Sequence, residues 1–321
     1  MNRNYVSIYG DYITKYIEYK IKMGYKAKKD AYMMFQIDKF AAETNQQSPG
    51  ITKEFAELWG EQRPHESKRY RYLRVAMLAR LSSFISDLDI ISFQPVLPPY
   101  PPSDFVPYIF TQAEINELFK YCDLLRLKLR NPNYLLFNMP MLLRILYATG
   151  IRISEAKNLL IDNVNTIDGF IKIEDSKNGQ ERLIPISKSL IQVCKSFKEE
   201  RAIFLGKQNK SIFFFSSKEG EKLDGGIHDY FHQCLDQMKL QGATKSGYPR
   251  IHDLRHTFAV TSMAKMAKQD IDMYASLPIL STYLGHMSIK STNTYIRITT
   301  SMYPELIEKL NINYIDIFPK I

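Results

Sequence analysis

The sequence has little cysteine, no long hydrophobic run and no nucleotide-binding motif. Only three cysteines occur in 321 residues, without the spacing of metal ligands or of a disulfide framework, which predicts reduced thiols in a cytoplasmic protein. No apolar run approaches the roughly 18 residues that span a bilayer, and the first residues lack the apolar core of a signal peptide. The phosphate-binding pattern G-x-x-x-x-G-K-S/T is absent, which argues against an ATP-driven enzyme.

Clusters of Asp and Glu at metal-ligand spacing are missing as well. Their absence argues against two-metal nucleases and predicts a reaction that uses no metal and no cofactor. What the sequence has in excess is positive charge, with a net charge of +9 and an isoelectric point of about 9.2. An excess of this sign favours a polyanionic partner such as nucleic acid. The length and the hydrophobic content of 45% suffice for two globular domains.

Residues 1–93 carry only helical patterns. Apolar positions recur at helical spacing in residues 5–22 and 29–42, and Thr52 is a candidate N-cap for a third helix ending at Gly60. An apolar stripe predicts a fourth helix: Tyr70, Leu73, Met77, Leu81, Phe84 and Leu88. Four basic residues crowd the first turns of that helix: Lys68, Arg69, Arg71 and Arg74. A basic helix end of this kind either lies against a DNA backbone or forms a solvated face, and the sequence leaves both readings open.

A proline-rich segment divides the chain. Six prolines fall within residues 94–107, including P-P-Y-P-P. Such a segment is stiff and extended and cannot form a helix or a central strand. It therefore predicts a linker between a first domain, residues 1–93, and a second domain, residues 108–321.

The second domain opens with helical signals. A T-x-x-E pattern at Thr111 matches a capping box and predicts a long helix after it. Residues 138–149 are nearly all apolar and predict a buried helix that ends at Gly150. A further helix restarts soon after with Ser154 as candidate cap, which places Arg152 at a helix junction.

Residues 169–186 alternate apolar and polar positions around a polar turn, which predicts a β-hairpin with Lys177 at its tip. Residues 212–216 either add a third short strand or lead into the next helix. The remaining helical patterns cover residues 226–240, 251–266, 276–284, 292–298 and 304–310. The expected fold is therefore mainly α (α+β), with a small antiparallel β-sheet in the second domain.

The sequence H-D-L-R-H places three chemically active side chains on one helix face. His252, Arg255 and His256 stand at positions i, i+3 and i+4. Two imidazoles and a guanidinium suit an anion, since arginine offers a fork of donors to phosphate and histidine moves protons near neutral pH. The zinc motif H-E-x-x-H is a poorer match, because Asp253 stands where its glutamate belongs.

This face belongs to an ordered set of motifs: T-G-I-R-I-S-E around Arg152, S-K-N-G-Q-E-R-L-I-P around Lys177, H-D-L-R-H-T-F-A around His252 and Arg255, L-G-H around His286, and S-T-N-T-Y ending at Tyr295. Through this set the second domain resembles the catalytic domain of the tyrosine recombinase (phage integrase) family. All six positions expected from the family are filled, in the family's order. The first domain resembles the family's helical core-binding domain in helix count and in its place before the linker.

The resemblance implies DNA strand cleavage and religation without metal or ATP. Tyr295 would attack the scissile phosphate and form a 3′-phosphotyrosyl intermediate, because a phenol serves both as nucleophile and later as leaving group. Arg152 and Arg255 would hold the non-bridging oxygens and take up charge in the transition state. Lys177 would act as the general acid for the 5′-oxygen.

The remaining residues of the expected site have supporting roles. His252 would assist proton transfer to or from the tyrosine, and His286 would donate a hydrogen bond to a phosphate oxygen. Glu155 would orient the first arginine. His256 and Asp253 are expected to be structural supports.

The resemblance also implies partners and a setting. The expected partner is double-stranded DNA with inverted-repeat core sites, on which a monomer in solution becomes a homotetramer and exchanges strands through a Holliday junction. Accessory directionality factors are expected as further partners. The expected role is that of a mobile-element integrase or transposase in a bacterial or phage-type, nucleoid-associated cytoplasm. The apolar tail Tyr303–Ile321 either docks on a neighbouring protomer or folds back on its own domain. Two rival functions stay open, namely DNA relaxation like that of type IB topoisomerases and DNA-binding regulation with a degenerate site.

Overall fold

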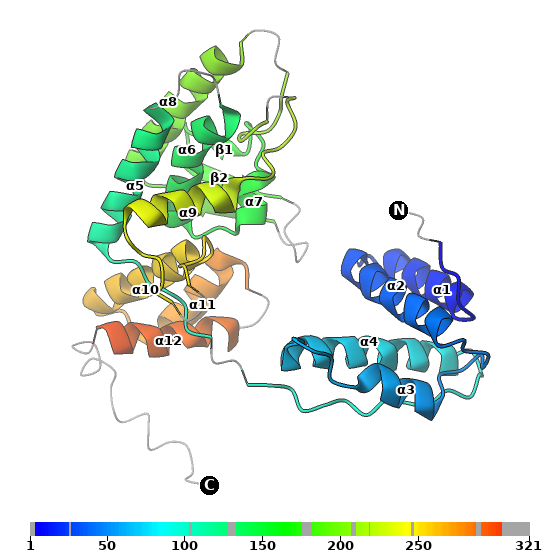
Figure 1. Cartoon of the computed structure of the whole chain (residues 1–321). Coiled ribbons are helices and arrows are strands. Elements are labelled where there is room, and N and C mark those ends of the chain that lie inside the picture. The colour runs from blue at the N-terminus through cyan, green and yellow to red at the C-terminus, as the bar shows by residue number, and fades with distance from the viewer. Residues whose placement is uncertain are drawn as a thin grey trace, which may run out of the picture. The chain divides into compact units, whose positions relative to one another are not determined.

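The computed structural model describes residues 4–25, 27–102, 105–127, 133–174, 181–206, 210–217, 219–244, 247–286 and 290–303. The chain forms two compact units, Met1–Phe105 and Val106–Ile321 (Figure 1). Both units are mainly helical and the second contains a three-stranded antiparallel sheet, so the predicted fold class is confirmed. Among the helices that the structure describes, none is both long and apolar enough to cross a membrane.

The helices of the first unit are α1 (Gly10–Lys22), α2 (Lys28–Glu43), α3 (Lys53–Gly60) and α4 (Lys68–Ser86). The hydroxyl of Thr52 accepts a hydrogen bond from the N–H of Phe55 at 3.2 Å, which confirms Thr52 as the N-cap of α3. Helix α1 begins later than predicted. The N–H groups of Val6 and Ser7 donate to the carboxylate of Asp38 at 2.8 and 3.0 Å and so hold this segment outside the helix.

Helix α4 is rotated relative to the predicted apolar stripe. Tyr70, Leu73 and Leu88 are 39%, 46% and 41% exposed, so only the middle of the stripe, from Met77 to Phe84, packs in the core. In its first turns the helix buries Arg74 instead, whose side chain is 1% exposed. The guanidinium of Arg74 donates to Glu66 Oε1 at 2.8 Å and to the carbonyl of Glu61 at 2.8 Å, so this buried charge is paired.

The four basic residues at the start of α4 therefore do not share one surface. The prediction that Arg74 contributes to an exposed basic face is wrong, because its donors are used inside the unit. Lys68 and Arg69 are exposed, and Arg71 is half-buried with its Nε donating to the carbonyl of Gly60 at 2.7 Å.

The second unit contains α5 (Gln112–Leu127), α6 (Tyr134–Thr149), α7 (Ile153–Lys157), β1 (Val164–Asn165), β2 (Phe170–Ile173), β3 (Arg182–Pro185), α8 (Lys188–Leu205), α9 (Ile227–Gln237), α10 (Asp253–Lys268), α11 (Met273–Leu284) and α12 (Lys290–Met302). The nearly all-apolar α6 lies at the centre and packs against α5, α8, α9 and α10 (Figure 1). Helices α10, α11 and α12 pack on one another at one end of the unit. The predicted capping box is confirmed, since Thr111 N–H donates to Glu114 at 2.7 Å and Glu114 N–H donates to the Thr111 hydroxyl at 3.2 Å.

The sheet has the order β1-β2-β3, with Ile171 opposite both Val164 and Ile184. The third strand is thus β1, because the segment 212–216 forms only isolated bridges, from Phe213 to Leu160 and from Ser216 to Lys222. Helix α8 was not predicted from the sequence. Its buried face is a narrow line within a largely polar segment, made of Leu190, Cys194, Phe197 and Arg201. Lys177 and the helix predicted at 304–310 lie outside the described residues.

Candidate active site

The first arginine of the site is positioned by the end of the buried helix α6. Gly150 closes this helix in the left-handed conformation with φ 61°, and a Cβ there would lie 2.4 Å from the ring of Phe258. Two residues later Arg152 itself, rather than the predicted Ser154, is the N-cap of α7. Its backbone N–H donates to Glu155 Oε2 at 2.9 Å, so the side chain of Arg152 starts from a fixed backbone.

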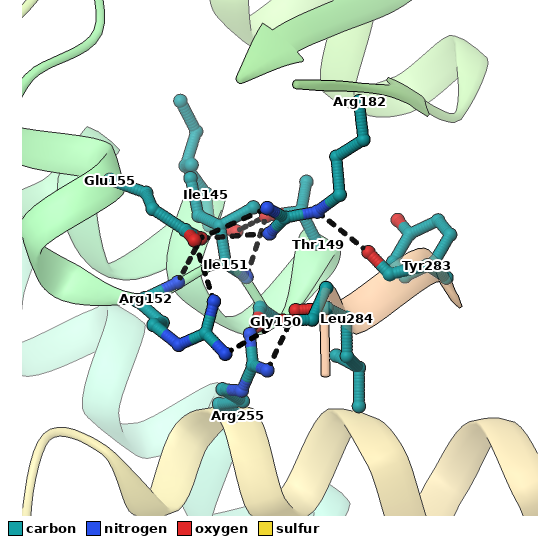
Figure 2. Close-up of polar contacts among 11 residues, drawn as sticks. Ile145, Thr149, Gly150, Ile151, Arg152, Glu155, Arg182, Arg255, Tyr283 and Leu284 are labelled. Carbon is teal, nitrogen blue, oxygen red and sulfur yellow. Dashed lines mark hydrogen bonds and ion pairs between the residues drawn. The ribbon is translucent and has the colours of Figure 1, made fainter. Parts of the chain in front are cut away.

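Two arginines share the carboxylate of Glu155 (Figure 2). Arg152 Nη1 donates to Oε1 at 2.8 Å, and Arg182 on β3 donates to both oxygens at 3.2 and 2.8 Å. Burial alone would raise the pKa of the Glu155 carboxyl, but the hydrogen bonds from Arg182 and Arg152 outweigh burial and lower it. The carboxylate is therefore ionised at neutral pH and fixes both guanidiniums.

Three arginines converge on consecutive backbone carbonyls at the C-terminus of α11. Arg182 Nε donates to the carbonyl of Tyr283 at 2.9 Å, Arg255 Nη2 to that of Leu284 at 2.8 Å, and Arg152 Nη2 to that of Gly285 at 2.9 Å (Figure 2). The last carbonyls of a helix lack partners within it and carry partial negative charge. They therefore bring three guanidiniums together that would otherwise repel one another.

Arg255 joins the ends of two helices. Its Nη1 donates to the carbonyl of Gly150 at 2.7 Å while Nη2 binds the end of α11, and the residue is 2% exposed. Burial and the nearby charge of Arg152 lower the pKa of Arg255 to about 10, so it remains a cation at neutral pH. A buried, fixed cation of this kind is a preorganised electrostatic group for an anionic reaction centre.

The hydroxyl of Tyr295, on α12, lies inside this cluster. The residue is 3% exposed, and its oxygen lies 3.0 Å from Nδ1 of His256. Burial raises the pKa of Tyr295, although the charges of Arg255 and Arg152 oppose that rise. The phenol is therefore protonated at neutral pH and needs a proton acceptor before it can act as a nucleophile.

Two histidines, His256 and His286, lie beside the tyrosine, and a third, His252, contacts His256. The ring of His286 lies nearly parallel to that of Tyr295 with centroids 6.4 Å apart, and His286 Nδ1 lies 2.8 Å from the Thr292 hydroxyl. His252 meets His256 edge to face at 5.0 Å. Burial, reinforced by neighbouring positive charges, lowers the pKa of His252 and His286 to about 4 and that of His256 to about 3. All three imidazoles are neutral at pH 7.

The structure thus brings together predicted residues from four separate segments: Arg152, Glu155, His252, Arg255, His286 and Tyr295. Lys177 lies outside the described residues. Within the described part of the chain, no group of three or more His, Cys, Asp or Glu is placed to ligate a metal.

Sequence reasoning did not predict that Arg182 joins the cluster or that His256 contacts Tyr295. Arg182 shares the inward face of β3 with the buried Ile184, and a charged residue on the apolar side of a predicted strand is a detectable signal. His256 was predicted to be only a support, like Asp253, whose buried carboxylate accepts the N–H of Arg250 at 2.8 Å at the start of α10.

The site places three arginines and three histidines in one cluster with a buried tyrosine, and comparisons with known proteins show the family to which this chain belongs. The sequence model of the phage integrase family matches residues 109–302. The protein y4rB of Sinorhizobium fredii, named as an integrase/recombinase, is 31% identical over 317 residues, covering 95% of this chain and 98% of y4rB. Tyrosine recombinase XerA of Pyrococcus horikoshii is 29% identical over 204 residues, covering 64% of this chain and 61% of XerA. The chain therefore belongs to the phage integrase family and is a site-specific recombinase of the tyrosine type.

Solved structures have the same fold. The integrase of transposon Tn1549, in complex with transposon right end DNA, has a TM-score of 0.63 at 15% identity and covers 90% of this chain and 94% of its own. A lambda integrase tetramer bound to a Holliday junction has a TM-score of 0.58 at 19% identity, covering 87% of this chain and 77% of the integrase. At such low identity the likeness concerns the fold alone.

Proposed function

We propose that this recombinase cuts and rejoins DNA strands through a 3′-phosphotyrosyl link to Tyr295. Arg152 and Arg255 hold the non-bridging oxygens of the scissile phosphate and neutralise the charge that develops at phosphorus. Glu155 fixes Arg152 for that task. Lys177 protonates the leaving 5′-oxygen. The energy of the cleaved bond is kept in the phosphotyrosyl link, so religation needs neither a metal nor ATP.

The histidines complete the proposed reaction. His286 donates a hydrogen bond to a phosphate oxygen from its place beside Tyr295, and His252 assists the transfer of the tyrosine proton. Both imidazoles have a pKa lowered to about 4 and are therefore neutral at pH 7, which suits a hydrogen-bond donor and a group that assists a proton transfer.

One observation carries this proposal. The charges of Arg255 and Arg152 both act on the hydroxyl of Tyr295, and the two arginines bind the neighbouring carbonyls of Leu284 and Gly285. An anion bound by the two guanidiniums would therefore lie close to the tyrosine oxygen. This proximity supports a displacement at phosphorus by that oxygen, since reactants held in place lose little entropy on the way to the transition state.

The proposed substrate is double-stranded DNA with inverted-repeat core sites. The protein is a monomer in solution and a homotetramer on DNA, exchanges strands through a Holliday junction, and serves a mobile element as integrase or transposase in the bacterial or phage-type cytoplasm, with accessory proteins setting direction. The Tn1549 integrase on transposon end DNA and the lambda integrase tetramer on a Holliday junction support this assignment by their shared fold.

A suicide substrate tests the chemistry. The substrate is DNA from the mobile element with a nick close to the cleavage site. Cleavage releases the short strand end that would otherwise reverse the reaction. The wild-type protein should therefore become covalently attached to the DNA and shift in a denaturing gel. The variant Tyr295→Phe should bind the same DNA without attachment. Attachment of the Phe variant, or a wild-type protein that binds the element's DNA and is never attached, would contradict the proposal.

A further inference from the structure

The tyrosine hydroxyl has a direct neighbour that the proposed mechanism leaves without a task. Nδ1 of His256 lies 3.0 Å from the oxygen of Tyr295, and the two rings lie 5.7 Å apart. His256 stands one helical turn after His252 on α10, so both imidazoles face the same site. Among the described contacts, His256 is the histidine whose ring nitrogen reaches the hydroxyl oxygen of the nucleophile.

The protonation states of the two groups allow the tyrosine to be the donor in this contact. The phenol is protonated at neutral pH and the imidazole of His256 is neutral, so one of its two ring nitrogens carries a lone pair. In the tautomer with the proton on Nε2, Nδ1 accepts the O–H of Tyr295. In that tautomer the proton of the nucleophile already points at the nitrogen that would receive it.

We propose that His256 is a catalytic residue of this recombinase and accepts the proton of Tyr295 through Nδ1 as the phosphotyrosyl bond forms. The Oη–H bond of the tyrosine breaks and its proton passes to Nδ1, while the Oη–P bond forms and the P–O5′ bond breaks. The general acid then protonates the 5′-oxygen, so both protons are accounted for. The inference rests on the proposed function and names the acceptor for its first step.

The charges of the site explain why His256 becomes a better base when DNA binds. Its pKa is lowered by burial first and then by surrounding positive charge. The titratable and charged groups that face it come from α10 and its start, from the turn after α11 and from α12: His252, Arg250, Arg255, His286 and Tyr295. A phosphate bound at the arginines offsets part of that positive charge, so it moves the pKa of His256 upward, toward the ordinary value of 6.5.

The test compares a variant that keeps the contact with one that abolishes it. Asparagine at position 256 can still accept the hydrogen bond from the phenol but cannot take up the proton, whereas leucine can do neither. The substrate is the nicked DNA with sulfur in place of the bridging 5′-oxygen, because a thiolate with a pKa of about 8.5 leaves without needing a general acid. The rate of covalent attachment then reports the nucleophile alone.

The expected result is a loss of about 100-fold in attachment rate for both His256→Asn and His256→Leu, at the lower end of what a general base contributes. DNA affinity should be unchanged, and His232→Asn, a control in the same unit, should attach like wild type. Between pH 7 and 9 the wild-type rate should be flat, while the Asn variant should accelerate roughly tenfold per pH unit, because only hydroxide then removes the proton.

Two outcomes would overturn the inference. An Asn variant as fast as wild type would show that His256 only holds the ring in place. A wild-type rate that itself rises tenfold per pH unit would show that the phenol loses its proton to solvent, and this measurement needs no variant. Failure of the proposed function looks different, since the wild-type protein would then not attach to DNA through Tyr295 at all.

Discussion

The shared carboxylate of Glu155 allows a quantitative prediction for the variant Glu155→Gln. The glutamate side chain is 2% exposed and binds two guanidiniums whose side chains are only 18% and 10% exposed. Removing one partner of a buried ion pair costs about 3–5 kcal/mol. Glutamine keeps an acceptor oxygen and both arginines retain some solvent, so we expect the lower end, about 3 kcal/mol. For a unit of this size, that loss lowers the melting temperature by roughly 6–12 °C.

The chain contains its own reference for this measurement. Its one tryptophan, Trp59, is buried in the first unit, whereas Glu155 lies in the second. Thermal unfolding followed by far-UV circular dichroism should show the shift, and the transition followed by tryptophan fluorescence should not move. The control Glu200→Gln removes one partner of the more exposed ion pair between Arg126 and Glu200, also in the second unit. It should cost less than about 1 kcal/mol.

The pH dependence of this effect has a definite sign. The pKa of Glu155 in the folded protein lies below its ordinary value of 4.5, because hydrogen bonds from Arg182 and Arg152 outweigh the effect of burial. The stabilisation is therefore complete above about pH 4.5 and is lost as the pH falls through the lowered pKa. The difference between wild type and Glu155→Gln should narrow below that pH. If Glu155→Gln lowers the melting temperature at pH 7 by no more than Glu200→Gln does, the reasoning is refuted.

Three further predictions follow from single contacts. Gly285→Ala should destabilise the second unit by more than Gly242→Ala in a thermal melt, because both glycines have positive φ but only the Cβ at 285 meets a guanidinium, at 2.8 Å; equal losses would argue against the clash. Arg255→Lys should slow covalent attachment to nicked DNA by about 10²–10³-fold, since an ammonium cannot reproduce the fork that joins two helix ends; near-normal rates would contradict this. Arg74→Ala should lower the tryptophan-detected stability of the first unit by about 3–5 kcal/mol, whereas Arg69→Ala should leave it unchanged and instead weaken DNA binding in a gel-shift assay; the reverse pattern would place Arg74 at the surface.

Features that depend on a few neighbouring residues could be predicted from the sequence. Thr52 and Thr111 cap helices as expected because a hydroxyl reaches an N–H three residues away without help from the rest of the fold. Gly150 ends α6 for a similarly local reason. The predicted buried face of α4 was wrong at Arg74. This arginine is buried because it packs on the ring of Trp59 and binds the carboxylate of Glu66, both of which come before the helix in the sequence. The short strand β1 was missed since two residues carry no periodic signal.

By itself, the sequence determined the order of the motifs and the chemistry that each residue type can perform. It also determined which helices form, wherever caps and apolar spacing act over a few residues. Only the tertiary structure decided that three arginines meet at the end of α11 and that His256 contacts Tyr295. The contact from Arg152 to the carbonyl of Gly285 spans 133 positions, and that from Arg255 to Gly150 spans 105. Partners so far apart are selected by the packing of whole helices, which no local pattern encodes.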